Sequence, residues 1–268
     1  MNDIELSILL PAFIAGLLVL TTHIPLGMKV LERGVIFADL AVAQIAGLGV
    51  IIAALLGLTG QPLLVQTIAA ASALCGAALL AWIENRLAEV KEACIGLTFV
   101  LAASGGILLM SRDPHADEHL KDLLVGQILW VSNYQLIATA FLTVTLLALW
   151  QWSKLKTHYL GFYALFALAV TASVQLVGVY LVFASLIVPA LATAGMRGVQ
   201  RLLTAYLIGA LGYASGLVLS AVLDLPSGAL IVWTLAGCGI LAQFIPAVRR
   251  SHPAQHGSAP RAKVTADA

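Results

Sequence analysis

One uncharged stretch decides the fold: YLGFYALFALAVTASVQLVGVYLVFASLIVPALATA, from Tyr159 to Ala194. A membrane core about 30 Å thick is crossed by roughly 20 helical residues, and this stretch is too long for one crossing. Basic residues flank it on both sides: Lys154, Lys156, Arg197 and Arg201. Because basic residues collect on the cytoplasmic side, both ends should lie there. The stretch therefore predicts a hairpin of two short helices, with Gln175 near its middle.

The rest of the chain has the same apolar character. Of its 268 residues, 61% are hydrophobic and 10% are charged, whereas a soluble domain is about half apolar and about a quarter charged. Apolar runs divided by charges and turn residues predict spans near Ser7–Thr22, Ile36–Leu58, Pro62–Trp82, Ala93–Met110, Gln135–Trp150, Tyr159–Ser173, Leu176–Ala194, Leu202–Leu223 and Ser227–Phe244. The fold class is therefore an all-α, polytopic helical bundle of about nine spans, surrounded by membrane lipid. The net charge of +1 gives no field for binding nucleic acid.

The distribution of Lys and Arg predicts the orientation. With the N-terminus outside and the C-terminus in the cytoplasm, only Arg112 and Lys121 are left outside. Residues 1–248 form one transmembrane domain in this interpretation, and residues 249–268 a disordered cytoplasmic tail rich in Pro, Ser, Ala and His. The expected location is the cell (inner) membrane, as a multi-pass protein.

Sequence motifs exclude several activities. A nucleotide-binding Walker A loop reads GxxxxGK[ST], and the chain has no Gly-Lys pair. No HExxH or GxSxG motif supports proteolysis within the membrane. The chain is therefore expected not to be an enzyme and to bind no cofactor, so any ATP hydrolysis has to come from a separate partner.

Asp39 is the most informative single residue, because it lies near the start of a predicted span. An ionisable group inside a membrane is costly unless it faces water or a partner, so Asp39 is a candidate ligand for a cation. The alternative is a helix cap, since a carboxylate also suits the positive end of the helix dipole. Gln44 lies deeper in the same span and is a second candidate ligand, or simply a hydrogen-bonding group between helices. Five residues correspond to about 140° around a helix, so the two side chains should not share a face.

Two histidines lie in the polar loop between Ser111 and Asp122. His115 and His119 are four residues apart and could share a divalent ion with an acidic neighbour if the loop is helical. The alternative is a solvated loop that docks a partner. The segment that follows, Leu120–Val131, is amphipathic and too short to cross, which predicts a re-entrant or interfacial helix.

A kink and a basic turn end the seventh predicted span. Pro189 interrupts the helix, and small residues lead into Arg197 and Arg201, which are four apart and so on one face if helical. This pattern predicts a docking site for a cytoplasmic partner. Small-residue steps at Gly212–Gly216 and Ser72–Gly76 predict close helix packing within one bundle.

Four segments together resemble the permeases of metal-ion ABC importers. VGVYLVFASLIVPALAT (Val177–Thr193) is similar to a family segment that reads broadly VG-x-LLV-x-ALL-x-x-PAATA. LDLPSGALIVW (Leu223–Trp233) resembles the family turn D-x-P-[ST]-G-x-x-IV, and LVGQILWVS (Leu124–Ser132) resembles LFG-[DNS]-IL-x-VS. RGVIFADLAVAQIAGLG (Arg33–Gly49) is similar to the second helix of the family.

The resemblance implies the function and the partners. It implies the permease of a zinc, manganese or iron importer, with zinc as the first expected cargo and manganese as the second. The permease would form a homodimer with two cytoplasmic ABC ATPase subunits and would receive its ion from a periplasmic metal-binding protein. The family places its coupling helix just after the PAATA-like segment, at Arg197 and Arg201 here. The second helix of the family usually carries His one turn after its Asp; here that position is Ala43, next to Gln44.

Two other functions remain alternatives. A permease for a metal chelate, such as a siderophore or corrinoid, should need more spans and a longer chain. A secondary transporter driven by an ion gradient should show several intramembrane ionisable residues and inverted repeats. Asp39 is nearly the only ionisable residue within the predicted spans.

Overall fold

The computed structural model describes residues 3–58, 60–110, 126–152 and 158–245. These residues form nine α-helices and one 3₁₀ turn, with no strand among them. The helices are α1 (Asp3–Arg33), α2 (Ala38–Leu55), α3 (Pro62–Arg86), α4 (Lys91–Met110), α6 (Asn133–Trp152), α7 (Tyr159–Val177), α8 (Val179–Ala192), α9 (Gly198–Leu223) and α10 (Ser227–Ala242), and the 3₁₀ turn η1 is Ile128–Trp130. The predicted tail, residues 249–268, lies outside the described residues.

Seven of these helices are long and apolar enough to cross a membrane; α8 and α10 are shorter, with 14 and 16 residues. The prediction of a polytopic helical bundle is thereby confirmed. The first helix is longer than expected, because α1 continues past Thr22 and through Pro25 to Arg33. A proline inside a membrane helix is tolerated where neighbouring helices compensate for the lost hydrogen bond.

The predicted hairpin is present, but its turn is sharper than expected. Helix α7 ends at Val177 and α8 begins at Val179, so Gly178 alone joins them, with φ +79° and ψ 164°. Only glycine adopts this conformation readily, which explains why the turn lies here and not at Gln175. Gly126 packs directly against this junction, since a Cβ there would lie 2.2 Å from the carbonyl carbon of Val177.

The segment expected to be a re-entrant helix is described only from residue 126 onward. There η1 forms a single 3₁₀ turn, and Ile128 within it is buried, with an exposed fraction of 1%. The loop thus enters the core at Ile128 as a short turn, and residues 120–125 lie outside the described residues.

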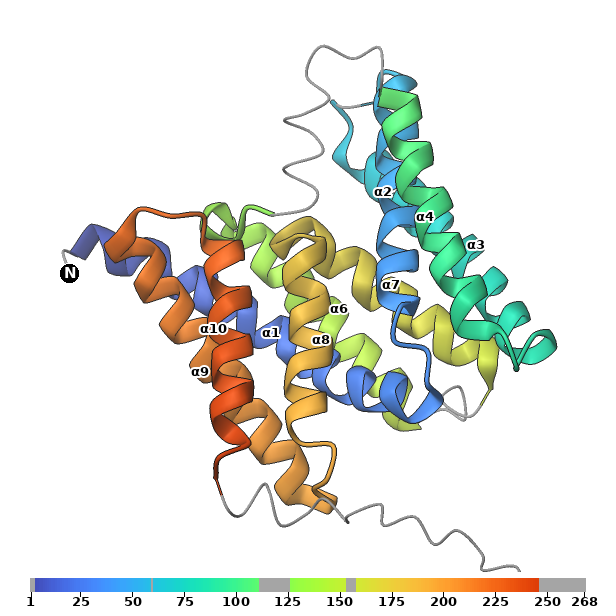
Figure 1. Cartoon of the computed structure of the whole chain (residues 1–268). Coiled ribbons are helices and arrows are strands. Elements are labelled where there is room, and N and C mark those ends of the chain that lie inside the picture. The colour runs from blue at the N-terminus through green and yellow to red at the C-terminus, as the bar shows by residue number, and fades with distance from the viewer. Residues whose placement is uncertain (1–2, 59, 111–125, 153–157, 246–268) are drawn as a thin grey trace, which may run out of the picture.

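The helices form two groups, which can be followed in Figure 1, and α7 packs against helices of both, namely α3 and α2 on one side and α8 and α1 on the other. Helix α2 packs against α3 and α4, and α10 packs against α9 and α8. Helix α1 packs against α8, α9 and α6. The predicted small-residue steps serve this packing: a Cβ on Gly216 would lie 2.6 Å from the Cα of Ile231 in α10, and one on Gly76 2.7 Å from Ile45 in α2. Both steps therefore pack helices within one chain, as predicted.

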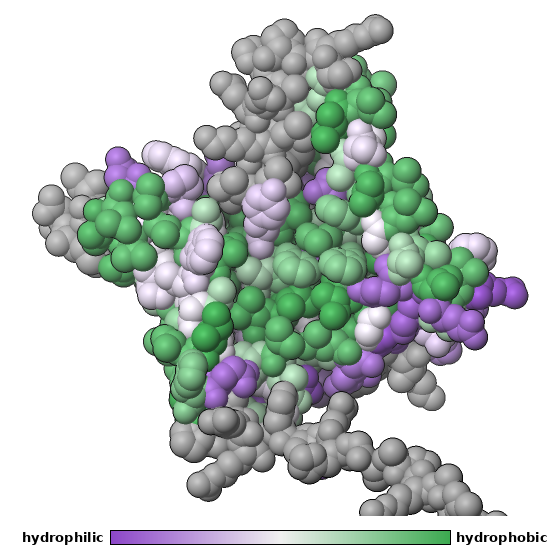
Figure 2. Space-filling view, in the orientation of Figure 1, coloured by the Kyte–Doolittle hydropathy of each residue, from purple (hydrophilic) through white to green (hydrophobic). Residues whose placement is uncertain are grey.

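The surface is mostly apolar, as expected for helices in contact with lipid. Figure 2 shows hydrophobic residues over most of this face, with hydrophilic residues gathered along the edge where α3 ends and α4 begins. Arg86 and Glu89 are exposed in this region. The concentration of polar groups at the helix ends fits the predicted cytoplasmic border of the membrane domain.

Candidate functional site

The turn between α1 and α2 sets the position of Asp39. Gly34, with φ +64°, ends α1: its N–H donates to the carbonyl of Leu31 (3.2 Å), and the N–H of Val35 donates to the carbonyl of Val30 (3.3 Å). These two bonds are those of a Schellman motif, and the buried side chains of Val30 and Val35 accompany them. The chain then enters α2, in whose first turn Asp39 lies.

Asp39 is fully buried, with an exposed fraction of 0%. Neither of its carboxylate oxygens has a hydrogen-bond partner among the described residues. The described residues also show no side-chain cap at the amino end of α2, so Asp39 lies near the positive end of the helix without bonding to its free N–H groups. Burying a carboxylate that has no partner costs several kcal/mol. A cation, or a group from a second chain, would compensate this cost.

A pocket opens one turn further along α2. It contains about 370 Å³ of empty space, part of which is open to solvent. The pocket lies between α2, α4 and the α7–α8 junction, and its lining residues are Ala43, Gln44, Gly47, Leu48, Ile51, Ala102, Ala103, Gly106, Val174 and Val179. Among these lining residues, all of which the structure describes, only Gln44 has a polar side chain. Ala43 is four residues after Asp39, hence on the same helix face, so Asp39 lies next to the pocket without lining it.

The structure thus brings Gln44, but not Asp39, into the pocket wall. His115 and His119 lie outside the described residues. Among the residues that are described, no group of three or more His, Cys, Asp or Glu side chains could hold a metal ion. Any cation near Asp39 would need further ligands from water, from backbone carbonyls or from another chain.

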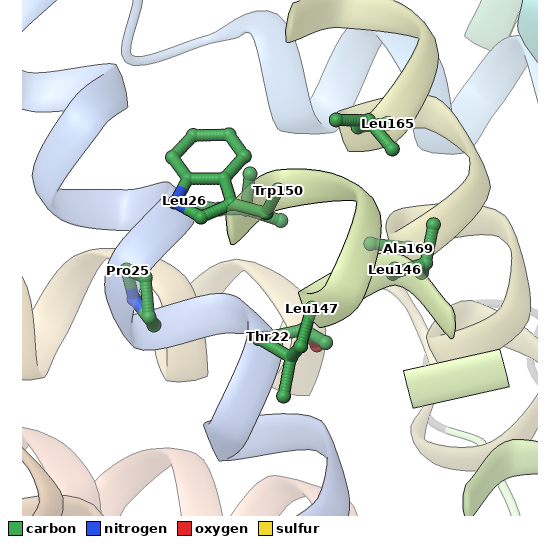
Figure 3. Close-up of a pocket in the computed structure, with 8 residues that line it drawn as sticks. All are labelled: Thr22, Pro25, Leu26, Leu146, Leu147, Trp150, Leu165 and Ala169. Atoms are coloured by element: carbon green, nitrogen blue, oxygen red, sulfur yellow. The ribbon is translucent and has the colours of Figure 1, made fainter. Parts of the chain in front are cut away.

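A second pocket has a different chemistry. It lies between α1, α6 and α7 beside Pro25, and Figure 3 shows its wall of Leu, Ala and Trp side chains with Thr22. The hydroxyl of Thr22 already bonds to the carbonyl of Val19 (3.1 Å) and to Nδ1 of His23 (3.0 Å). This pocket therefore offers no ligand set for an ion, and the pocket beside Gln44 is the better candidate site.

A buried ion pair, which the sequence did not indicate, lies where α1, α3 and α7 meet. Nη1 of Arg33 is 3.0 Å from Oε2 of Glu84, and the guanidinium lies 4.3 Å from the ring centre of Phe162 and 5.3 Å from that of Tyr159. The charged and aromatic partners come from three helices. This cluster fixes the ends of α1 and α3 and the start of α7 relative to one another, next to the turn that leads into α2.

The two arginines predicted to dock a partner differ in environment. Arg197 is exposed and precedes α9 in an extended conformation, with φ −133° and ψ 157°. Arg201 lies inside α9, and its Nη1 is 3.6 Å from Oε1 of Glu32 in the last turn of α1. The expectation that both occupy one helix face is therefore wrong, because the helix begins only at Gly198. Arg197 remains exposed to a partner, whereas Arg201 is paired within the chain.

Comparisons with known proteins agree with this architecture. The family model of the ABC 3 transport family matches residues 5–159 and 153–245. The chain is also similar to a solved structure described as PsaBC from Streptococcus pneumoniae in complex with Fab, with a TM-score of 0.71 and 23% sequence identity. That similarity covers 93% of this chain and 94% of the other. At this identity, the structural match shows a shared fold.

Proposed function

This chain belongs to the ABC 3 transport family of metal-ion permeases, multi-pass proteins of the cell membrane, and we propose that it is the permease of an ATP-driven importer that moves a divalent metal ion into the cytoplasm. The observation that carries this proposal is the carboxylate of Asp39 beside the pocket of α2 and α4, because it is fully buried and has no hydrogen-bond partner in the described part of the chain. A group so costly to bury suits a site where a cation passes or stops.

The donor atoms on α2 bear on the choice of metal. The resemblance to metal-ion permeases makes zinc the first expected cargo and manganese the second. Asp39 and Gln44 offer carboxylate and amide oxygens, while Ala43 takes the place of the usual family histidine. Manganese prefers carboxylate, carbonyl and water oxygens, whereas zinc favours imidazole and thiolate. Whether the ion meets Asp39 or Gln44, the side-chain donor is an oxygen, and this favours manganese over zinc among the candidate cargoes.

The proposed partners supply functions for which this sequence shows no motif. It has no Walker A motif, so a separate cytoplasmic ATPase has to supply the energy. Arg197, exposed before α9, is the proposed contact with that ATPase, where an acidic side chain would pair with it. We place two copies of this chain around one path, so that the partner copy supplies ligands that one chain lacks near Asp39. A periplasmic metal-binding protein would deliver the ion, and His115 and His119 would receive it.

Uptake into vesicles tests the proposal. The permease is reconstituted with its ATPase, and the uptake of ⁵⁴Mn²⁺ and ⁶⁵Zn²⁺ is measured with and without ATP and binding protein. We expect uptake that requires both, and faster uptake of manganese than of zinc at equal concentration. Uptake driven by a proton or sodium gradient without ATP would contradict the proposal and support a secondary transporter.

A further inference from the structure

Two consecutive residues at the start of α4 hold both ends of the α1–α2 turn. The amino group of Lys91 donates a hydrogen bond to the carbonyl oxygen of Arg33, the last residue of α1. The carboxylate of Glu92 accepts a hydrogen bond from the N–H of Phe37, the residue that precedes α2, with an N–Oε1 distance of 3.2 Å. Residues 34–36 lie between these two contacts.

Each contact satisfies a backbone group that the helices leave open. The Schellman bonds use the carbonyls of Val30 and Leu31, and Lys91 then takes that of Arg33. The charges also match the helix dipoles, because the ammonium lies at the negative end of α1 and the carboxylate at the positive end of α2. Lys91 and Glu92 therefore hold the two ends of the turn, each with the charge that suits the helix end it contacts. We call these two contacts the clamp.

Asp39 depends on this turn for its position. Its carboxylate makes no hydrogen bond within the described residues, so no side-chain contact of that kind orients it. Its place is set by the backbone, and the clamped Phe37 is only two residues before it. Helix α4 also supplies Ala102, Ala103 and Gly106 to the pocket wall. One helix thus fixes both the start of α2 and the wall of the pocket beside Asp39.

We propose that Glu92 and Lys91 are positioning residues that hold Asp39 in register with the cation path. This inference rests on the proposed function of the chain. The hydrogen bond to Phe37 needs an acceptor at residue 92 and no negative charge, so a glutamine there should preserve it. A displacement of about 1 Å can change a rate by about a hundredfold, and a ligand held in the wrong place binds its ion less tightly. Loss of the clamp should therefore appear mainly in the affinity for the ion.

The test compares four variants of the complete complex in vesicles, with ⁵⁴Mn²⁺ as the probe. Glu92→Ala removes the acceptor, and Glu92→Gln keeps it. Lys91→Met removes the contact to Arg33. Glu89→Ala is the matched control, since Glu89 is an exposed carboxylate in the α3–α4 turn, three residues before Glu92. We expect Glu92→Ala to raise the KM for the ion about tenfold or more, Lys91→Met to raise it less, and Glu92→Gln and the control to stay within about twofold of the wild type.

The amount of assembled complex and its basal ATPase rate separate positioning from folding, and we expect both to be unchanged in Glu92→Ala. A KM for Glu92→Ala equal to that of the control would overturn the positioning role alone. The same holds if Glu92→Gln is as impaired as Glu92→Ala, because the acceptor would then not be what matters. No ATP-dependent uptake by the wild-type complex would overturn the proposed function together with this inference.

Discussion

Arg33 at the end of α1 and Glu84 near the end of α3 form a buried ion pair, with 3.0 Å between Nη1 and Oε2. The exposed fractions of the two side chains are 11% and 7%. The ring of Phe162 in α7 lies against the same guanidinium, at 4.3 Å from its centre. Three helix ends are thereby joined at one point, close to the turn that leads to Asp39.

The first prediction concerns this pair. Glu84→Ala removes the carboxylate that Glu84 contributes to the Arg33 guanidinium, and removing one partner of a buried pair destabilises a protein by about 3–5 kcal/mol. We expect a clearly lower thermal unfolding midpoint of the purified permease in detergent. Lys29→Ala is the control, because Lys29 pairs with Glu32 at 3.1 Å with exposed fractions of 37% and 51%, and such surface pairs contribute about 1 kcal/mol or less. Equal midpoints for both variants would contradict the structural role of the pair.

The sequence predicted the spans well, because each span is an apolar run ended by charge or turn residues. The α7–α8 hairpin followed from the basic residues at both ends of an overlong stretch, although the position of its turn depended on Gly178. The Arg33–Glu84 pair was missed, since 51 residues separate its members and no periodic pattern links them.

The candidate site was predicted only in part. Asp39 was identified from its place in an apolar span, but its lack of a hydrogen-bond partner among the described residues is a property of the packed helices. The pairing of Arg201 with Glu32 depends on how α9 meets α1, so the sequence pattern suggested a shared face with Arg197 instead. The roles of His115 and His119 stay predictions, because these residues lie outside the described ones.

The second prediction concerns orientation. Gln61 and Glu89 are exposed just beyond opposite ends of α3. After the three native cysteines are replaced, a cysteine at Gln61 should react with an impermeant thiol reagent in intact cells, and one at Glu89 should react only after the cells are opened. The reverse pattern would place the N-terminus inside and would exchange the roles of the loops.

The third prediction concerns helix packing. A Cβ on Gly216 would lie 2.6 Å from the Cα of Ile231, and backbone atoms cannot move aside easily. We expect Gly216→Ala to destabilise the permease by about 1–3 kcal/mol, as overpacking does. At Gly237 no atom of the described residues lies within 4 Å of the corresponding Cβ, so Gly237→Ala should be tolerated. Thermal unfolding measures both, and equal stability would contradict the α9–α10 contact.

The fourth prediction separates the two arginines of the α8–α9 region. Arg197→Glu should reduce the ATPase that co-purifies with the permease by a few fold, because an exposed ion pair contributes about 1 kcal/mol or less. Arg201→Glu places a second negative charge next to Glu32. We therefore expect it to lower the unfolding midpoint of the permease, while the amount of co-purified ATPase falls less than in Arg197→Glu. Quantitative co-purification and thermal unfolding of both variants provide the test. A greater loss of ATPase with Arg201→Glu would show that Arg201 contacts the partner directly.

The central claim is that the carboxylate of Asp39 meets the transported cation. Asp39→Asn keeps the size of the side chain and removes its charge, so the most direct measurement is ATP-driven ⁵⁴Mn²⁺ uptake by vesicles containing this variant complex. We expect normal assembly of the permease with its ATPase and uptake reduced to the level seen without ATP, while Glu89→Gln, at an exposed carboxylate, transports normally. Wild-type uptake by Asp39→Asn would contradict the claim and would show that Asp39 does not act on the ion.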